Sequence, residues 1–217
     1  MLQPGQPAPR FTLPAGDVDA ALALDDLLRR GPLLLTLMRG LQCPFCRRNL
    51  ALLGNTRAKL QAIGVETLAI VATSAERARL YFKHRLVSIP VAADPDMATH
   101  RAYGVPCYPI TPALNKDLRA VRVDPFGELP EPVPFIARDG TEIHDVFDRM
   151  DGFEPTEVDQ RDRARQFRQA LQMCAQCLID RDGIVRWAHI EGDPGGLATA
   201  GRFPTDDQIV AVARTLR

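Results

Sequence analysis

The sequence lacks an excess of either charge and any long apolar run. Its 217 residues carry 27 Lys and Arg against 27 Asp and Glu, which gives a formal net charge of zero. This balance provides no electrostatic attraction toward nucleic acid or an anionic membrane surface, so neither partner is expected. The longest apolar runs are also far too short to span a bilayer.

The N-terminus lacks the apolar segment of a signal peptide, because Pro, Gly and Gln interrupt residues 1–11. We therefore expect a cytoplasmic protein. In that compartment its five cysteines are expected to be catalytic, metal-binding or inert rather than structural disulfides. The chain also has no Gly-rich phosphate loop, no Ser-His-Asp arrangement and no zincin motif, and we expect no cofactor.

The best-defined motif is a Cys-x-x-Cys pair, Cys43 and Cys46. The apolar run 33–38 before it predicts a buried strand, and the leucine spacing after it predicts a helix with one apolar face. Pro44 suits the first position of that helix, where a missing N–H costs nothing. The pair is therefore predicted at the junction between a strand and a helix N-terminus.

This position favours a reactive thiolate. The free N–H groups and partial positive charge of a helix N-terminus stabilise a negative sulfur. Arg39, Arg47 and Arg48 add to the positive field. We therefore predict that Cys43 is the nucleophile and that its pKa lies below the free-thiol value of about 8.5. Arg39 is equally open to binding an anionic substrate group or to being a solvated arginine in a turn.

The pair serves two reactions. With a peroxide, the Cys43 thiolate attacks the O–O bond and becomes a sulfenic acid, which Cys46 converts into a disulfide. With a protein disulfide, Cys43 attacks sulfur and Cys46 releases the mixed disulfide. A pair of buried, inert cysteines is the remaining alternative.

The rest of the chain predicts alternating strands and helices around this motif. A strand over 65–72 completes a right-handed βαβ unit with the strand and helix above, and Asp182-Gly183 turns a final hairpin. The other predicted elements are a short edge strand near 11–13, a helix over 19–30, a helix over 73–85 capped by Thr73, a strand over 89–93, a short helix over 94–104 and a last helix capped by Thr205.

Residues 105–172 differ from the rest, because prolines recur and strong periodicity is absent before residue 135. We predict a hairpin over 135–147 that turns at Asp139-Gly140, followed by a polar, exposed helix over 154–171. The segment has too few apolar residues for a core of its own. We therefore expect one domain, residues 1–217, with 105–172 as an insertion that covers the active site or forms a homodimer contact.

These elements together resemble the thioredoxin-like fold and, within it, the AhpC/TSA peroxiredoxin-like family. Residues 4–13, PGQPAPRFTL, resemble the family's Gly-x-x-Ala-Pro-x-Phe-x-Leu, and residues 39–46, RGLQCPFC, resemble the Arg-Gly-x-x-Cys-Pro-Phe/Tyr-Cys of a peroxiredoxin-like branch. Further similarity lies in IPVAADPD (89–96), AYGV (102–105) and LIDRDG (178–183). The resemblance covers residues 1–105 and 173–217.

The resemblance implies an α/β thioredoxin-like fold, with a central mixed sheet flanked by helices and an insertion before the final β-hairpin. It implies a thiol-dependent oxidoreductase that reduces peroxides through Cys43, with Cys46 as the resolving thiol and a thioredoxin-like protein or a small thiol as reductant. The alternatives are a protein disulfide reductase that uses the same pair, a zinc- or iron–sulfur-binding or sensing protein that uses Cys43, Cys46 and Cys174, and a scaffold whose insertion binds a partner.

The chain departs from the family at three positions. Gly40 stands where the family has a Thr or Ser that positions the peroxide, and Thr36 stands where it has Pro. Cys174 occupies the place of the family's distant arginine, or of the cis-proline in thioredoxin-like branches. By the same resemblance Cys174 is expected beside Cys43, where it would be a third thiol for resolution or a metal ligand.

The remaining cysteines and histidines are given structural roles. Cys177 is three residues from Cys174 on a predicted strand, so the two face opposite sides and Cys177 is expected in the core. Cys107 is expected to be a plain loop cysteine, with a role as a mobile resolving thiol as the alternative. Four histidines show no ligand spacing and are expected at the surface or at helix caps: His84, His100, His144 and His189.

Overall fold

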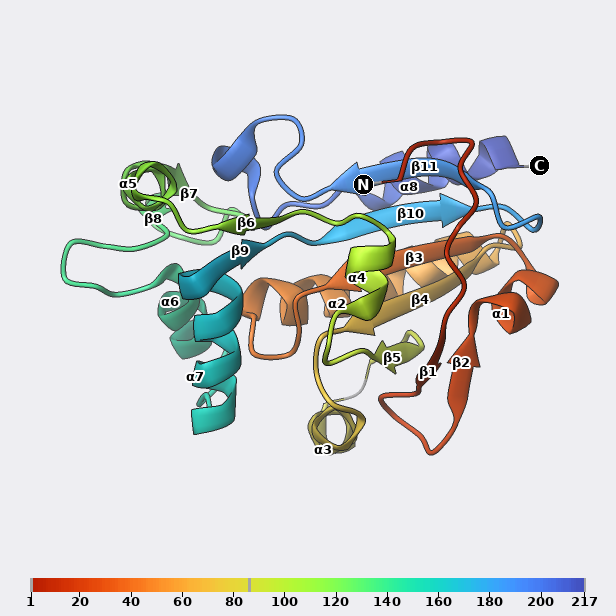
Figure 1. Ribbon diagram of the computed structural model, residues 1–217, viewed down its shortest axis with the longest axis horizontal. Helices are drawn as coiled ribbons and strands as arrows, with labels where there is room; N and C mark the ends of the chain where they lie inside the picture. Colours follow the sequence, from red (N-terminus) through yellow and green to blue (C-terminus); the bar gives the residue numbers. More distant parts are fainter. Residues whose placement is uncertain (1, 86, 217) are drawn as a thin grey trace.

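The centre of the molecule is a five-stranded mixed sheet with the order β11-β10-β3-β4-β5 (Figure 1). The computed structural model describes residues 2–85 and 87–216. Strands β3, β4 and β5 are parallel, and β10 runs antiparallel to both β3 and β11. The strands are β3 (Leu33–Met38), β4 (Glu66–Val71), β5 (Val91–Ala93), β10 (Ala175–Ile179) and β11 (Val185–Ile190). Every residue of β3 is buried, which explains why its sequence is apolar apart from Thr36.

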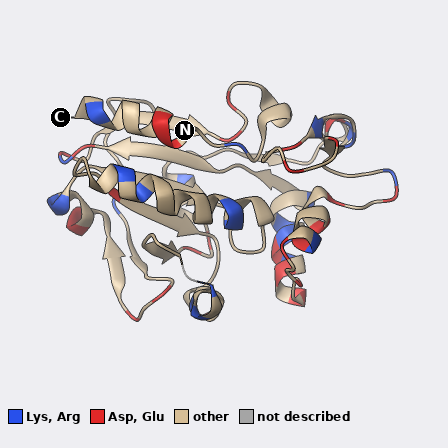
Figure 2. Cartoon of the chain, turned by 180° about the vertical axis from the view of Figure 1, so that it is seen from behind, with Lys and Arg blue, Asp and Glu red and all other residues tan. Residues whose placement is uncertain are grey.

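Helices cover both faces of this sheet. The helices outside 105–172 are α1 (Leu24–Arg30), α2 (Pro44–Gln61), α3 (Ala75–His84), α4 (Ala98–Ala102), α8 (Asp206–Ala213) and the short 3₁₀ turns η2 (Gly196–Thr199) and η3 (Arg214–Leu216). Helices α2 and α8 lie together on the face seen in Figure 2, and α4 lies on the opposite face, seen in Figure 1. The predicted mixed α/β architecture is therefore present.

The sheet register sets the place of the cysteines. Strand β3 ends at Met38, and Cys43 follows five residues later at the start of α2. Strand β10 runs back along β3 with Ala175 opposite Leu37. Cys174 therefore precedes β10 at the same end of the sheet from which the Cys-x-x-Cys loop emerges.

Residues 105–172 lie at this end of the sheet (green to teal in Figure 1). Their elements are β6 (Cys107–Pro109), α5 (Pro112–Ala120), β7 (Arg122–Val123), β8 (Val133–Pro134), α6 (Ile143–Met150), α7 (Glu157–Arg163), a π-helix η1 (Ala164–Gln169) and β9 (Ala170–Gln172). Apolar side chains of the segment, including Leu118, Phe135, Phe147 and Phe167, belong to the same core cluster as the sheet. The segment is thus packed onto the sheet and shares its core.

Two predictions in the first half of the chain need correction. The helix predicted over 19–30 begins only at Leu24, because 21–23 form β2 (Ala21–Ala23) and pair with β1 (Thr12–Pro14). Tertiary pairing overrides the helical spacing there. The cap of α3 is Ser74, whose hydroxyl accepts from the backbone of Arg77. The hydroxyl of Thr73, the predicted cap, instead accepts a hydrogen bond from Leu41 N at 3.1 Å.

Two predictions within 105–172 were also wrong. The turn at Asp139-Gly140 exists, but no second strand follows it, because Asp145 accepts from Glu142 N and starts α6. The single exposed helix predicted over 154–171 is instead α7, the π-helix η1 and β9. Its side chains include the buried Arg163, Gln166 and Phe167. By contrast, the final hairpin β10–β11 and the Thr205 cap of α8 are confirmed.

Within the described residues, no helix is long and apolar enough to cross a membrane.

Acid is expected to weaken the fold through His100 in α4. Burial lowers the pKa of this imidazole to about 4, against about 6.5 in the unfolded chain. Because the unfolded chain binds the proton first, this contribution is complete above about pH 6.5 and is lost as the pH falls toward about 4. At about 1.4 kcal/mol per pKa unit, the loss should reach about 3 kcal/mol.

Urea unfolding between about pH 7.5 and about pH 4.5 measures this effect. In His100→Gln the free energy of unfolding should fall over this range by about 2.5 kcal/mol less than in the parent, because about pH 4.5 is still above the folded pKa of about 4. The exposed His84 provides the control, and His84→Gln should keep the parent slope. Equal slopes in all three proteins would contradict the assignment to His100.

Candidate active site

The Cys-x-x-Cys pair stands at the N-terminus of α2, as predicted. Cys43 is the N-cap residue, with an extended backbone (φ −93°, ψ 117°), and Pro44 occupies the first turn. The preceding loop is pinned at Leu41, whose N–H donates to Thr73 and whose carbonyl accepts from Arg47 at 3.1 Å. These bonds fix where the first sulfur emerges from the sheet.

The structure brings three sulfurs together in a row. The thiols of Cys43 and Cys46 interact with each other, and Cys46 Sγ lies 3.8 Å from Cys174 Sγ. Cys174 therefore joins the pair, and the sulfur that it contacts is Cys46. Cys177 lies in the core, as expected from strand alternation, and Cys107 is exposed on β6.

The metal-binding alternative gains no support from this arrangement. Among the residues that the structure describes, no group of three or more His, Cys, Asp or Glu side chains is placed to hold a metal ion. The sulfurs are instead thiols, and all five cysteines are free.

A buried ion pair lies behind the sulfurs. The guanidinium of Arg39 donates two 2.8 Å hydrogen bonds to the carboxylate of Glu191 and a third, of 2.9 Å, to Gln172 O. The same carboxylate accepts from Cys174 N and Gly201 N, at 3.1 and 2.7 Å. Arg39 is thus neither solvated nor free. Its charge still acts on the thiols, since it lowers the pKa of both Cys43 and Cys46.

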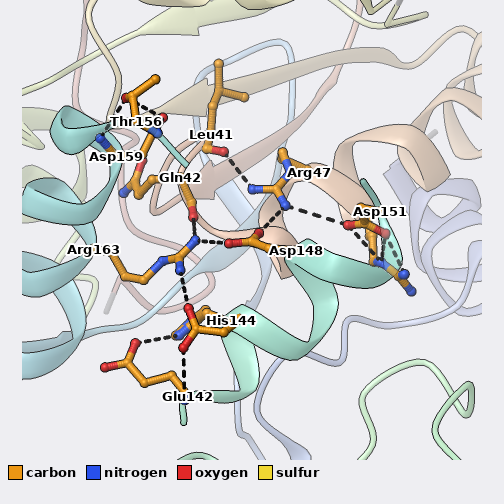
Figure 3. Close-up of polar contacts among 12 residues, drawn as sticks. Leu41, Gln42, Arg47, Glu142, His144, Asp148, Asp151, Thr156, Asp159 and Arg163 are labelled. Carbon is orange, nitrogen blue, oxygen red and sulfur yellow. Dashed lines mark hydrogen bonds and ion pairs between the residues drawn. The ribbon is translucent and has the colours of Figure 1, made fainter. Parts of the chain in front are cut away.

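Arg47 points toward Asp148 and Asp151 of the segment 105–172 (Figure 3). Arg47 donates to Asp148 at 2.6 Å, and Arg163 donates to the other oxygen of Asp148 at the same distance. Arg163 also donates to Gln42 O at 2.8 Å. Arg48 pairs with Asp151 and Glu128. These arginines therefore hold α6 and α7 over the loop that carries Cys43.

Burial corrects the predicted thiol pKa. Cys43 is 3 % exposed and Cys46 is 1 % exposed. Burial raises the pKa of Cys43 to about 12, and the hydrogen bond with Cys46 adds to this, while Arg39 and His144 act in the opposite direction. The low pKa predicted from the helix terminus and the arginines is therefore wrong for this closed arrangement. The sequence indicated that 105–172 could cover the active site, but not that the Cys43 sulfur itself would lose contact with water.

His144 is a site residue that the sequence did not reveal. It lies in the first turn of α6, is buried, and interacts with the thiol of Cys43. Its Nδ1 lies 3.6 Å from Glu142 Oε2 (Figure 3). Burial alone would lower the pKa of His144, but the contacts with Cys43 and Glu142 outweigh it and raise the pKa above its usual value. No spacing motif links His144 to Cys43, so only the fold could identify it.

The π-helix η1 supplies three consecutive side chains to the site. Gln166 Oε1 accepts from Gln42 Nε2 at 2.6 Å. Phe167 packs edge-on against the ring of His144, with centroids 4.6 Å apart. Arg168 donates to Glu142 at 2.5 Å. A π-helix often marks a functional site, because its extra residue changes which side chains face inward.

Gly40 has no room for the hydroxyl that the family carries there. Its φ is 146°, and a Cβ would meet Gln42 Oε1 at 2.5 Å and Ala72 O at 2.9 Å. The amide of Gln42 therefore fills the space that a side chain at position 40 would need. Gln42 and Gln166 are both buried, and their side-chain amides lie beside the loop that carries Cys43.

The comparison with family models decides the relationship. The AhpC/TSA family model matches residues 4–146, about two thirds of the chain. The chain belongs to the AhpC/TSA family. The match runs past residue 105, so it includes part of the segment that the sequence could not relate to any family. No curated protein sequence gives a significant match.

Solved structures confirm the thioredoxin-like fold. Peroxidoxin BcpB from Mycobacterium tuberculosis has a TM-score of 0.58 at 14 % identity, with 100 % of this chain and 99 % of that chain covered. The reduced 2-Cys peroxiredoxin of Plasmodium vivax has a TM-score of 0.59 at 13 % identity, with 97 % and 79 % covered. A putative thiol:disulfide interchange protein DsbE from Chlorobium tepidum has a TM-score of 0.53 at 20 % identity, with 98 % and 99 % covered.

Membership of the AhpC/TSA family identifies the chain as a thiol oxidoreductase, either a thiol peroxidase or a thiol–disulfide oxidoreductase.

Removal of Asp148 is expected to weaken the attachment of α6 and α7 to the loop that carries Cys43. Asp148→Ala would leave Arg47 and Arg163 buried without their shared carboxylate, and breaking such a pair costs about 3–5 kcal/mol. Urea unfolding at neutral pH measures the loss. As a control, Asp26→Ala removes an exposed partner of Arg29 and should cost no more than about 1 kcal/mol. Similar losses in the two variants would show that the buried pair has no special weight.

Proposed function

We propose that this protein reduces peroxides, with Cys43 as the attacking thiol and Cys46 as the resolving thiol. The observation that carries the choice of substrate is the burial of both sulfurs beneath α6 and η1. A small peroxide needs only a narrow path to reach Cys43. A disulfide in a folded protein would have to displace these helices, which are held by the buried Asp148 ion pairs.

The reaction balances in three steps. The Cys43 thiolate attacks one peroxide oxygen, an S–O bond forms, the O–O bond breaks, and the departing alkoxide takes a proton to become an alcohol. Cys46 then attacks the sulfenic sulfur, so that an S–S bond forms and water leaves. A dithiol, either a thioredoxin-like protein or a small thiol, returns two electrons and two protons. We further propose a cytoplasmic setting, where such reductants keep thiols reduced.

Disulfide reduction is the second candidate, and the geometry at Gly40 favours it. The residue carries no hydroxyl, and its backbone and surroundings leave no space for one. The hydroxyl by which the family positions a peroxide is therefore missing, whereas thiol–disulfide exchange does not need it.

Cys174 extends the proposed chemistry beyond the pair. Its sulfur lies 3.8 Å from that of Cys46, so a small movement brings them to the bond length of about 2.05 Å. Attack by Cys174 on a Cys43–Cys46 disulfide would form Cys46–Cys174 and release Cys43 as a thiol. A groove of about 650 Å³ is bounded by Met173 and Glu191, the neighbours of Cys174. It offers a reductant an approach on that side.

The central assignment is tested by peroxide consumption. Reduced protein should consume hydrogen peroxide with dithiothreitol or thioredoxin, and Cys43→Ser should reduce the rate to background, because the attacking sulfur is gone. Cys46→Ser should accumulate a sulfenic acid that dimedone traps. Cys107→Ser, which removes an exposed cysteine, should retain the parent rate. Turnover in Cys43→Ser would refute the assignment, and insulin reduction without peroxide consumption would favour the disulfide reductase.

The third thiol is tested by mapping disulfides after oxidation with diamide. Cleavage after Arg39, Arg47, Arg168 and Arg181 puts Cys43 with Cys46 on one peptide and Cys174 with Cys177 on another. Oxidised Cys43→Ser should therefore give a cross-linked peptide pair that joins Cys46 to Cys174. A Cys177→Ala background keeps the assignment unique. If Cys46 stays reduced in that protein, the proposed exchange does not occur.

A further inference from the structure

The buried position of Cys43 creates a need for a nearby proton acceptor. Taking a thiol out of water disfavours its charged form, and the charge of Arg39 is already shared with Glu191 at 2.8 Å. A guanidinium is also always protonated and cannot accept a proton. Two other side chains interact with the thiol of Cys43, namely Cys46, which is itself a buried thiol, and His144, which is an imidazole. Only the imidazole is a base near neutral pH.

The carboxylate of Glu142 lies next to the imidazole of His144. Neither His144 Nδ1 nor Glu142 Oε2 has a hydrogen-bond partner within the part of the chain that the structure describes, and the two atoms lie 3.6 Å apart. The other oxygen of Glu142 accepts from Arg168 at 2.5 Å. This bond keeps the carboxylate charged although it is buried. Cys43, His144 and Glu142 thus form a thiol–imidazole–carboxylate series.

Two aromatic rings fix the plane of the imidazole. Phe45, the third residue of the Cys-x-x-Cys motif, lies with its centroid 5.3 Å from that of His144. Phe167 of η1 approaches the imidazole edge-on at 4.6 Å. The ring is therefore held between the helix that carries the thiol and the π-helix that carries the partner of Glu142.

We propose that His144 is the proton acceptor for Cys43 and that Glu142 positions it, so that residues 105–172 contribute part of the reaction centre itself. The inference rests on the proposed role of Cys43 as nucleophile. The proton on Cys43 Sγ moves to the imidazole as the thiolate attacks, which gives a thiolate and an imidazolium. After the O–O bond breaks, the imidazolium returns its proton to the alkoxide, and an alcohol leaves.

The charged groups around His144 come from every element packed against it. Cys43 faces it from the N-cap of α2, Glu142 from the start of α6, Arg163 from α7, and Arg168 from η1, where it is bound to Glu142. Arg163 opposes the imidazolium, while Glu142 favours it. Protonation of His144 before attack would remove the base, so the reactivity of Cys43 should fall as the pH falls through the pKa of His144.

The test is the rate at which iodoacetamide alkylates Cys43 in the reduced, full-length chain across pH. Fragmentation of the peptide 40–47 in the mass spectrometer separates Cys43 from Cys46. His144→Gln keeps a polar side chain of similar size but cannot accept the proton. Its rate at neutral pH should fall about 100-fold, the low end of general-base contributions, and its acidic limb should disappear. His84→Gln, at an exposed site on α3, should match the parent at every pH.

Glu142→Gln provides an independent readout that a merely structural role would not move. Without the carboxylate charge the pKa of His144 should drop, so the acidic limb should shift to lower pH while the maximal rate also falls. This variant decides the question alone if His144→Gln does not fold, as judged by circular dichroism. A parent-like pH profile in a folded His144→Gln, or an unshifted limb in Glu142→Gln, would overturn the proposal.

The readout also separates this proposal from the proposed function. Alkylation reports activation of Cys43 whether or not peroxide is the substrate. Slow alkylation of His144→Gln without an acidic limb in its pH profile, together with a parent that consumes no peroxide, would support the role of His144 and refute peroxide reduction. Normal alkylation of His144→Gln with active peroxide consumption by the parent would refute the role of His144 and support peroxide reduction.

Discussion

The ion pair between Arg39 and Glu191 ties together the elements that carry the sulfurs. It joins the end of β3 to the end of β11, and Glu191 also binds the backbone of Cys174 and Gly201. Two buried charges are tolerated only when their hydrogen bonds are met, and here both carboxylate oxygens are used. The row of three thiols therefore depends on this pair. The same pairing shares the charge of Arg39 with Glu191.

Reactivity at Cys43 is consequently set by what covers it. Helices α6, α7 and η1 exclude water from Cys43 and raise the pKa of its thiol. The same helices also place polar side chains near this thiol that a solvent-exposed site would lack. Hydrogen bonds of Asp148 and Arg163 attach α6 and α7 to the loop that carries Cys43. His144 and Glu142 lie at the start of α6, the helix that is attached in this way. The segment 105–172 thus makes ionisation of Cys43 unfavourable by burying it. The same segment supplies His144 and Glu142, which are suited to accept the proton.

The sequence predicted those parts of the site that local patterns determine. The apolar run of β3, the proline after Cys43 and the Asp182-Gly183 turn placed the Cys-x-x-Cys loop and the return strand correctly. The place of Cys174 near the pair was implied by the family resemblance and not by these patterns. His144 and the pKa of Cys43 could not be predicted, because both depend on contacts across about 100 residues with no spacing motif. The predicted cap of α3 was wrong for the same reason. The hydroxyl of Thr73 accepts a hydrogen bond from Leu41 N, which lies in the loop after another strand.

In the π-helix Ala164–Gln169, the number of residues is as important for the site as their identity. Three neighbours in it reach three different members of the site, namely Gln42, His144 and Glu142. Loss of one residue would restore ordinary α-helical bonding but turn everything beyond it by about 100°. A single-codon deletion before β9 would therefore uncouple α6 and η1 from the cysteines, even if every remaining side chain were unchanged.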